Sequence, residues 1–199
     1  MAAEPTTAEP DAALELVDHR PGWTDEFRQL AARLRSALGS AALRIDHVGS
    51  TSLPAIPAKD ILDVQVTVAE LAEACVALRS AGFVERSDIR SDHVPPGVGG
   101  AAADWSKAYF TEPTGLRRMN IHVRLTDRPN QRYALVFRDY LRSHPQSAHA
   151  YGELKRRLAS SLANVADYPD VKDPAADLVY LAAEAWARQS GWQPPPSDG

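Results

Sequence analysis

Residues 47–66 read HVGSTSLPAIPAKDILDVQV, and this stretch says most about the fold and its chemistry. It begins at the end of an apolar segment, turns through small residues, and continues as a segment in which apolar and polar residues alternate. Leu62 and Val64 alternate with Asp63 and Gln65, which is the period-two pattern of a strand with one apolar and one polar face. The sequence therefore predicts a strand, a tight turn and a second strand that carries a carboxylate on its polar face.

The turn consists of Gly49, Ser50, Thr51 and Ser52. Small residues after a strand allow backbone N–H groups and hydroxyls to approach an anion closely. The spacing of a Walker A loop and that of a dinucleotide-binding fingerprint are both absent. With Lys59 close behind, we predict that the turn binds a phosphate group, and a polar turn without a ligand is the alternative.

Composition limits the function classes. The chain has 199 residues, of which 44% are hydrophobic and 24% charged, so one domain is expected. A net charge of −4 argues against a general affinity for nucleic acid or for an anionic membrane. The single Cys75, the lack of a signal-peptide pattern and the lack of a long apolar run predict a cytoplasmic protein with no nucleic-acid or membrane partner.

Both ends of the chain are poor in large apolar residues. Such segments cannot offset the entropy lost on ordering. We therefore expect disordered tails at 1–13 and 193–199 around a single folded domain at 14–192.

Hydrophobic periodicity predicts the remaining elements. Strands are expected at 42–48, 62–68, 83–86, 105–110 and 117–125, helices at 23–38, 69–81 and 173–189, and two more helices between 130 and 162 that His144-Pro145 separates. Residues 88–104 are rich in glycine and proline and are expected to form an irregular, mobile loop. The fold class is α+β, with a mixed β-sheet of about 4–5 strands, packed helices and a helical C-terminal half.

The last two helices each carry a stripe of apolar residues. The stripes that we expect to face the core consist of Tyr151, Leu154, Leu158 and Leu162, and of Leu178, Leu181, Ala185 and Trp186.

Polar side chains alternate along 117–125, where Asn120 and His122 share one face with arginines. If this strand lies beside 62–68, Asp63 and His122 line one sheet surface and form an anion pocket. Together they supply only two metal ligands, which favours hydrogen bonding or acid–base chemistry for His122 over zinc binding. The alternatives are a solvated strand face and a histidine satisfied by its neighbours.

Several motifs in order resemble the GrpB family. They are His47–Pro54, Ala58-Lys59, Ile61–Val64, Asn120–Val123, Phe137–Arg142 and Tyr151-x-x-Leu154-Lys155. This family is similar in fold to nucleotidyltransferases of the polymerase-β type, in which a Gly-Ser turn holds a triphosphate and acidic residues hold metal. The resemblance implies that Gly49 and Ser50 form the turn and that Asp63 is the first acid, while Gln65 and His122 occupy the other two acid positions.

The leading hypothesis is a nucleotidyltransferase-like protein that binds a nucleotide or another phosphorylated small molecule and transfers a nucleotidyl group to a small acceptor. Asp63 and His122 are its candidate catalytic residues, and Asp63 is also the candidate ligand for Mg²⁺. The candidate ligand-binding residues are Gly49, Ser50, Thr51, Lys59, Lys107, Arg118 and Arg138. The alternatives are a non-catalytic ligand-binding module and an acyl or amide transferase that uses His122 as its base.

Overall fold

The computed structural model describes residues 15–54, 56–162, 164 and 167–199, so the N-terminal tail expected at 1–13 lies outside the described residues. A five-stranded sheet with the strand order β1-β2-β5-β4-β3 forms its centre. The strands are β1 (Ala42–Val48), β2 (Leu62–Val68), β3 (Val84–Glu85), β4 (Lys107–Thr111) and β5 (Met119–Leu125). β2 and β5 pair in parallel and the other neighbours pair antiparallel, which confirms the mixed sheet.

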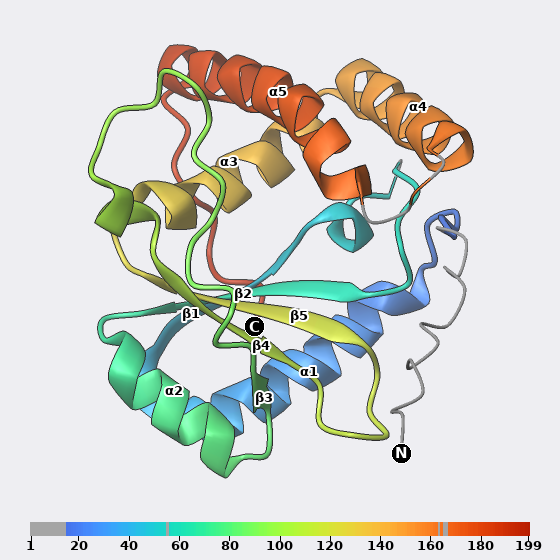
Figure 1. Cartoon of the computed structure of the whole chain (residues 1–199). Coiled ribbons are helices and arrows are strands. Elements are labelled where there is room, and N and C mark those ends of the chain that lie inside the picture. The colour runs from blue at the N-terminus through green and yellow to red at the C-terminus, as the bar shows by residue number, and fades with distance from the viewer. Residues whose placement is uncertain (1–14, 55, 163, 165–166) are drawn as a thin grey trace, which may run out of the picture.

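Helices cover both faces of this sheet (Figure 1). They are α1 (Gly22–Leu38), α2 (Leu71–Ser80), α3 (Pro129–Ser143), α4 (Pro145–Ser161) and α5 (Tyr168–Ser190). α1 and α2 lie against one face, and α3 lies against the other with α4 and α5 packed on it. Since both faces are covered, the polar face of β2 is enclosed by protein and is not a solvated surface.

The main hydrophobic core lies between the sheet and the helices α1 and α2. The predicted stripe of α1 faces it, and Trp23, Phe27 and Leu34 are almost fully buried there. The apolar face of β2 completes this core. In the part of the chain that the structure describes, every helix is too short or too polar to span a lipid bilayer.

The predicted inward face of α5 is wrong. Leu178 and Leu181 are 71% and 50% exposed, whereas Asp177 and Tyr180 are buried. The error has a physical cause: the inner side of α5 carries small and aromatic residues, Tyr180, Ala183 and Ala187, which pack with Val136 of α3. The largest apolar residues of α5 therefore do not mark its buried side. Asp177 is buried on the same helix and accepts a hydrogen bond from Nε2 of His93, in the segment 88–104, at 3.0 Å, if that nitrogen carries the proton.

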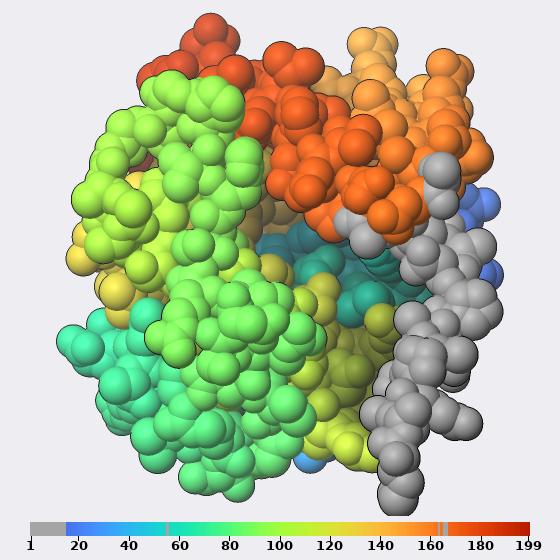
Figure 2. Space-filling view, in the orientation of Figure 1, coloured from blue at the N-terminus to red at the C-terminus, as the bar shows by residue number. Residues whose placement is uncertain are grey.

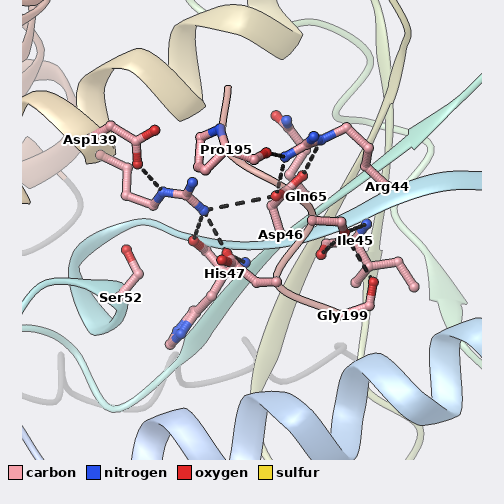
Figure 3. A network of polar contacts seen from close by, with 12 residues as sticks. Arg44, Ile45, Asp46, His47, Ser52, Gln65, Asp139, Pro195 and Gly199 are labelled. Atoms are coloured by element: carbon pink, nitrogen blue, oxygen red, sulfur yellow. Dashed lines mark hydrogen bonds and ion pairs between the residues drawn. The ribbon is translucent and has the colours of Figure 1, made fainter. Parts of the chain in front are cut away.

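The C-terminal segment 193–199 lies along the outer edge of β1 (Figure 3). Ser197 Oγ bonds both the N–H and the C=O of Ile45, and Gly199 N donates to the same carbonyl at 3.0 Å. This differs from the expected disordered tail. The disordered tail was expected because the segment has few large apolar residues. Hydrogen bonds to the unpaired backbone groups of an edge strand hold it instead.

Asp198 connects the same segment to a buried ionic network. Its Oδ2 accepts from His47 N at 2.9 Å and from Arg138 Nη1 at 2.6 Å. Arg138 is almost fully buried and also donates to Asp139 Oδ1 and to the carbonyl of His47. A charge so deeply buried depends on these partners.

We therefore expect Asp198→Ala to lower the free energy of unfolding by about 1–3 kcal/mol, because it leaves a buried N–H unpaired and removes a partner of Arg138. Urea denaturation measures this change. The matched control is Asp25→Ala, which breaks an exposed carboxylate–arginine pair with Arg28 and should cost about 0–1 kcal/mol. Equal losses in the two variants would contradict the role given to Asp198.

Candidate functional site

A cavity of about 380 Å³ opens on the sheet face that α3, α4 and α5 cover. It is lined by the end of β1 and the turn after it, by the starts of β2 and β5, and by all three helices. Figure 2 shows a hollow on this side of the molecule, with α5 in orange above it and teal residues of the first strands at its base. Polar and aromatic residues of the lining are Ser50, Lys59, Asp63, Asn120, His122, Arg124, Tyr133, Phe137, Tyr151, Lys155, Tyr168 and Lys172.

Gly49 allows the turn to lie directly against Asp63. The register pairs Val48 with Asp63, so the residue after Val48 crosses the carboxylate. Gly49 has φ +65° and ψ −170°, a region that is essentially restricted to glycine. A Cβ at this position would lie 2.7 Å from Asp63 Cβ and closer still to Oδ2. The turn therefore requires glycine for both its conformation and its space.

Asp63 is held in place by its neighbour on β5. In the parallel register it lies beside Asn120, whose Nδ2 donates to Asp63 Oδ1 at 2.7 Å. Tyr109 Oη in turn donates to Asn120 Oδ1 at 2.5 Å, which fixes the orientation of the amide. Burial alone would raise the pKa of Asp63, but the interactions with His122, Asn120 and Lys155 outweigh it and hold that pKa below its ordinary value. Asp63 is therefore a carboxylate at neutral pH, with 27% of its side chain exposed in the cavity.

One ring nitrogen of His122 faces Asp63, and the other faces two cations. Its Nε2 is 3.9 Å from Asp63 Oδ1, while Lys107 Nζ and Arg124 Nη2 lie 3.2 and 3.4 Å from Nδ1. Since those cations can only donate, Nδ1 is the acceptor and Nε2 carries the proton. Burial, then the charge of Arg124, lower the pKa of His122 to about 4, so the ring is neutral at neutral pH.

Asp92 is a residue that the sequence analysis missed. It sits in the irregular segment 88–104 and is nearly enclosed. Lys107 Nζ donates to it at 2.7 Å, and Arg124 holds both of its oxygens at 2.8 Å. Burial would raise the pKa of Asp92, but these two cations depress it well below its usual range. Lys107 and Arg124 thus share one carboxylate, which compensates one of their two positive charges.

Lys155 of α4 enters the cavity wall beside the turn. It is 3% exposed, and its Nζ donates to Ser50 Oγ at 2.6 Å and to the carbonyl of Pro57 at 2.5 Å. Burial, with the charge of Lys172 adding to it, lowers the pKa of Lys155 to about 7. The sequence analysis did not select this lysine. The signal available was its i,i+4 spacing from Tyr151, which places both side chains on one helix face.

Aromatic rings form another part of the wall, next to the lysines. Tyr133, Phe137 and Tyr151 contact one another edge-on or stacked, with centroids 5.6–5.9 Å apart. Lys59 Nζ lies 5.3 Å from the ring centre of Tyr168. The cavity wall thus combines lysines with flat apolar surfaces, on which a ring system can stack.

The structure brings together five of the predicted site residues, Gly49, Ser50, Lys59, Asp63 and His122, as lining of one cavity. The other four lie outside that lining. Thr51 Oγ1 lies 2.9 Å from His47 Nε2, Lys107 and Arg138 are used in ion pairs, and Arg118 is exposed.

The residues around Asp63 do not fit Mg²⁺. This ion prefers several oxygen ligands, commonly carboxylates. At the second acid position Gln65 is fully buried, and its Oε1 accepts from Arg124 Nη1 at 2.6 Å. At the third, His122 has no free lone pair. Among the described residues no three His, Cys, Asp or Glu side chains gather as a metal cluster, and the ammonium of Lys155 contributes to lowering the pKa of Asp63.

Fold and site together define an α+β protein with a lysine-containing cavity above a mixed sheet. The chain belongs to the GrpB family, because the family model described as GrpB protein matches residues 13–180. Among solved structures, GrpB from Enterococcus faecalis is 26% identical with a TM-score of 0.69, over 86% of this chain and 99% of that one. Cid1, solved with a UTP analogue, is 13% identical with a TM-score of 0.47, over 69% of this chain and 41% of that one.

Curated relatives carry two kinds of name. A dephospho-CoA kinase of Mycolicibacterium paratuberculosis is 34% identical over 92% of this chain and 49% of its own length. A UPF0157 protein of Halalkalibacterium halodurans is 31% identical over 88% of this chain and 85% of its own length. The chain therefore spans about half the length of the kinases that it matches.

Proposed function

We propose that the cavity binds a nucleotide or another phosphorylated small molecule, and that the protein transfers a nucleotidyl group from it to a small acceptor. The observation that supports this proposal is that a Gly-Ser turn, lysines, a carboxylate and aromatic rings line the same cavity of about 380 Å³. Phosphate groups are recognised by such turns and by lysine, and flat rings stack on aromatic side chains.

In this proposal each part of the cavity has a role. Gly49 and Ser50 contact the phosphate, Lys59 and Lys155 neutralise it, and Asp63 orients the acceptor. The acceptor oxygen attacks the α-phosphorus and passes its proton to the Asp63 carboxylate, and pyrophosphate leaves with the electrons of the broken P–O bond. The contribution of the protein is positioning and charge stabilisation rather than covalent catalysis. Lys107, which the sequence predicted to bind phosphate, has no role in this proposal because its ammonium forms an ion pair with Asp92.

Pyrophosphate release tests the transfer reaction. We expect release from at least one nucleoside triphosphate in the presence of small alcohols or amines, and a loss of about 100-fold or more in Asp63→Ala, since a positioned proton acceptor contributes on that order. Asp18→Ala serves as the control because this carboxylate is exposed on the surface. Absence of turnover with every triphosphate and acceptor contradicts the transfer reaction.

A non-catalytic ligand-binding module is the second candidate, and the pair Gln65 and His122 favours it. Neither offers a metal ligand, while the turn and the lysines proposed to bind phosphate line the cavity. Binding that stabilises the protein in thermal-shift assays without product formation identifies this case. Acyl or amide transfer with His122 as base is disfavoured, because cations occupy Nδ1 and Nε2 is protonated.

A further inference from the structure

The cavity carries more positive charge than its walls neutralise. Its lining includes Lys59, Lys155 and Lys172 but a single carboxylate, that of Asp63. Arg124 also lines it and shares the carboxylate of Asp92 with Lys107, so these three groups together keep one positive charge. This local excess stands in a chain whose net charge is −4. The cavity is therefore suited to an anion although the protein as a whole is acidic.

Lys155 is the clearest instance of a buried charge that has no carboxylate in direct contact with it. Its ammonium is buried, and its contacts are the hydroxyl of Ser50 and the carbonyl of Pro57, both neutral. Within the described residues no carboxylate lies within salt-bridge distance of it. Burying a charge without a counter-ion is costly, so proteins rarely do so except where a ligand supplies the counter-ion.

The other two lysines increase the repulsion instead of relieving it. The pKa of Lys59 is lowered by burial, then by the neighbouring charges of Arg118 and Lys172. Lys172 has one carboxylate nearby, that of Asp173 at 3.4 Å, and remains partly exposed. Three ammonium groups thus converge on one cavity with a long ion pair and a shared carboxylate as their only compensation among the described residues.

Tyr168 provides an independent sign that this wall lacks a partner. The residue is 4% exposed and lines the cavity beside Lys59. Its hydroxyl is buried and has no hydrogen-bond partner among the described residues. Buried hydroxyls are seldom left unpaired, so this wall holds a polar group whose hydrogen bond the described residues do not supply.

We infer that the phosphate of the ligand binds directly to the ammonium groups of Lys59, Lys155 and Lys172, without a bridging divalent metal ion. The inference rests on the proposed function and specifies the form of the ligand: a free polyphosphate, as in a nucleoside triphosphate, rather than its Mg²⁺ complex. Lysine ammoniums take the place that carboxylate-bound Mg²⁺ would fill, because Gln65 and His122 leave no metal site next to Asp63.

Titration calorimetry with the full chain tests this directly. The probes are pyrophosphate and each of the four ribonucleoside triphosphates, in excess EDTA and in excess Mg²⁺. We expect binding in EDTA and equal or weaker binding in Mg²⁺, since Mg²⁺ cancels part of the charge that the lysines recognise. Binding that requires Mg²⁺ overturns the inference and leaves the proposed function standing. No binding of any probe under either condition overturns both.

A charge-removing variant identifies the residues responsible. Lys155→Gln should weaken binding in EDTA by about 10- to 100-fold, the range expected for loss of a hydrogen bond to a charged group. The matched control is Arg157→Gln, which removes one positive charge from an exposed position of the same helix and should leave binding unchanged. Equal affinities in both variants, with circular dichroism showing both folded, overturn the assignment. The EDTA comparison on the unmodified chain stands independently of either variant.

Discussion

Replacing Gly49 by alanine should lower the free energy of unfolding by about 2–6 kcal/mol and should abolish ligand binding in whatever fraction stays folded. Two costs add. The backbone at φ +65° and ψ −170° is strained by about 1–3 kcal/mol for any residue with a Cβ. The new methyl group also overlaps Asp63, and overpacking of this kind costs about 1–3 kcal/mol. The chain can relieve the overlap only by moving the turn or the carboxylate, and both belong to the site.

The control is another glycine with positive φ but open space around it. Gly115, in the turn between β4 and β5, has φ +81° and no heavy atom within 4 Å of the place that a Cβ would take. Gly115→Ala should therefore cost about 1–2 kcal/mol, from conformation alone. Urea unfolding of both variants, followed by calorimetry with pyrophosphate, separates the two contributions. Similar losses in both would show that the contact with Asp63 contributes nothing.

The sequence was sufficient to predict which residues of the sheet face the site. Alternation along β2 and β5 reports the pleat of each strand directly, because successive side chains point to opposite faces. Once these strands are neighbours, Asp63 and His122 must share one surface, and the structure places them 3.9 Å apart. The glycine turn followed from the same reasoning, because it had to lie where one strand ends and the next begins.

The helical half of the site could not be predicted in the same way. Leu154 and Leu178 belong to apolar stripes, yet both are exposed, at 37% and 71%, while Lys155 and Asp177 next to them are buried. Hydrophobic periodicity assumes that the buried side of a helix is its most apolar side. That assumption fails where a helix lines a polar cavity, so a conflict between pattern and burial is expected at a functional site.

The sequence also could not predict which lysine lacks a carboxylate partner. Lys107 lies between Ser106 and Ala108, and Lys155 is followed by two arginines, and neither setting indicates whether the lysine has a carboxylate partner. They differ because Asp92, in an irregular segment without periodicity, reaches Lys107 and not Lys155. The partner of a charge is set by tertiary structure, and a single sequence gives no access to it.

Raising the pH from 7 to 9 should stabilise the ligand-free protein and, over the same range, weaken its binding of a triphosphate. Both effects follow from Lys155. Burial, helped by the charges of Lys172 and Lys59 and opposed by Asp63, lowers the pKa of this lysine from 10.5 to about 7. Between these values the unfolded chain holds one more proton than the folded one, so the free energy of unfolding rises with pH, by up to about 1.4 kcal/mol per pH unit.

The rise of the free energy of unfolding with pH ends near pH 9, because other groups then lower the stability as the pH increases. Burial raises the pKa of the Cys75 thiol above 9.0, and burial raises the pKa of Tyr109 to about 12. Unfolded, these groups lose their protons first, so their contribution to stability falls as the pH rises past their ordinary values. His47 and His122 are outside this pH range, because burial lowers the pKa of each to about 4.

Binding responds with the reverse sign, because the triphosphate requires the ammonium form of Lys155 that a higher pH removes. Affinity should fall by up to about tenfold per pH unit above 7, with proton uptake on binding that calorimetry detects as a dependence on the buffer. Lys155→Gln should flatten both profiles, whereas Arg157→Gln should keep them. Stability and affinity that rise together or fall together with pH would contradict the assignment. Loss of the Lys155 charge should stabilise the free protein and weaken anion binding, so the two profiles must change in opposite directions.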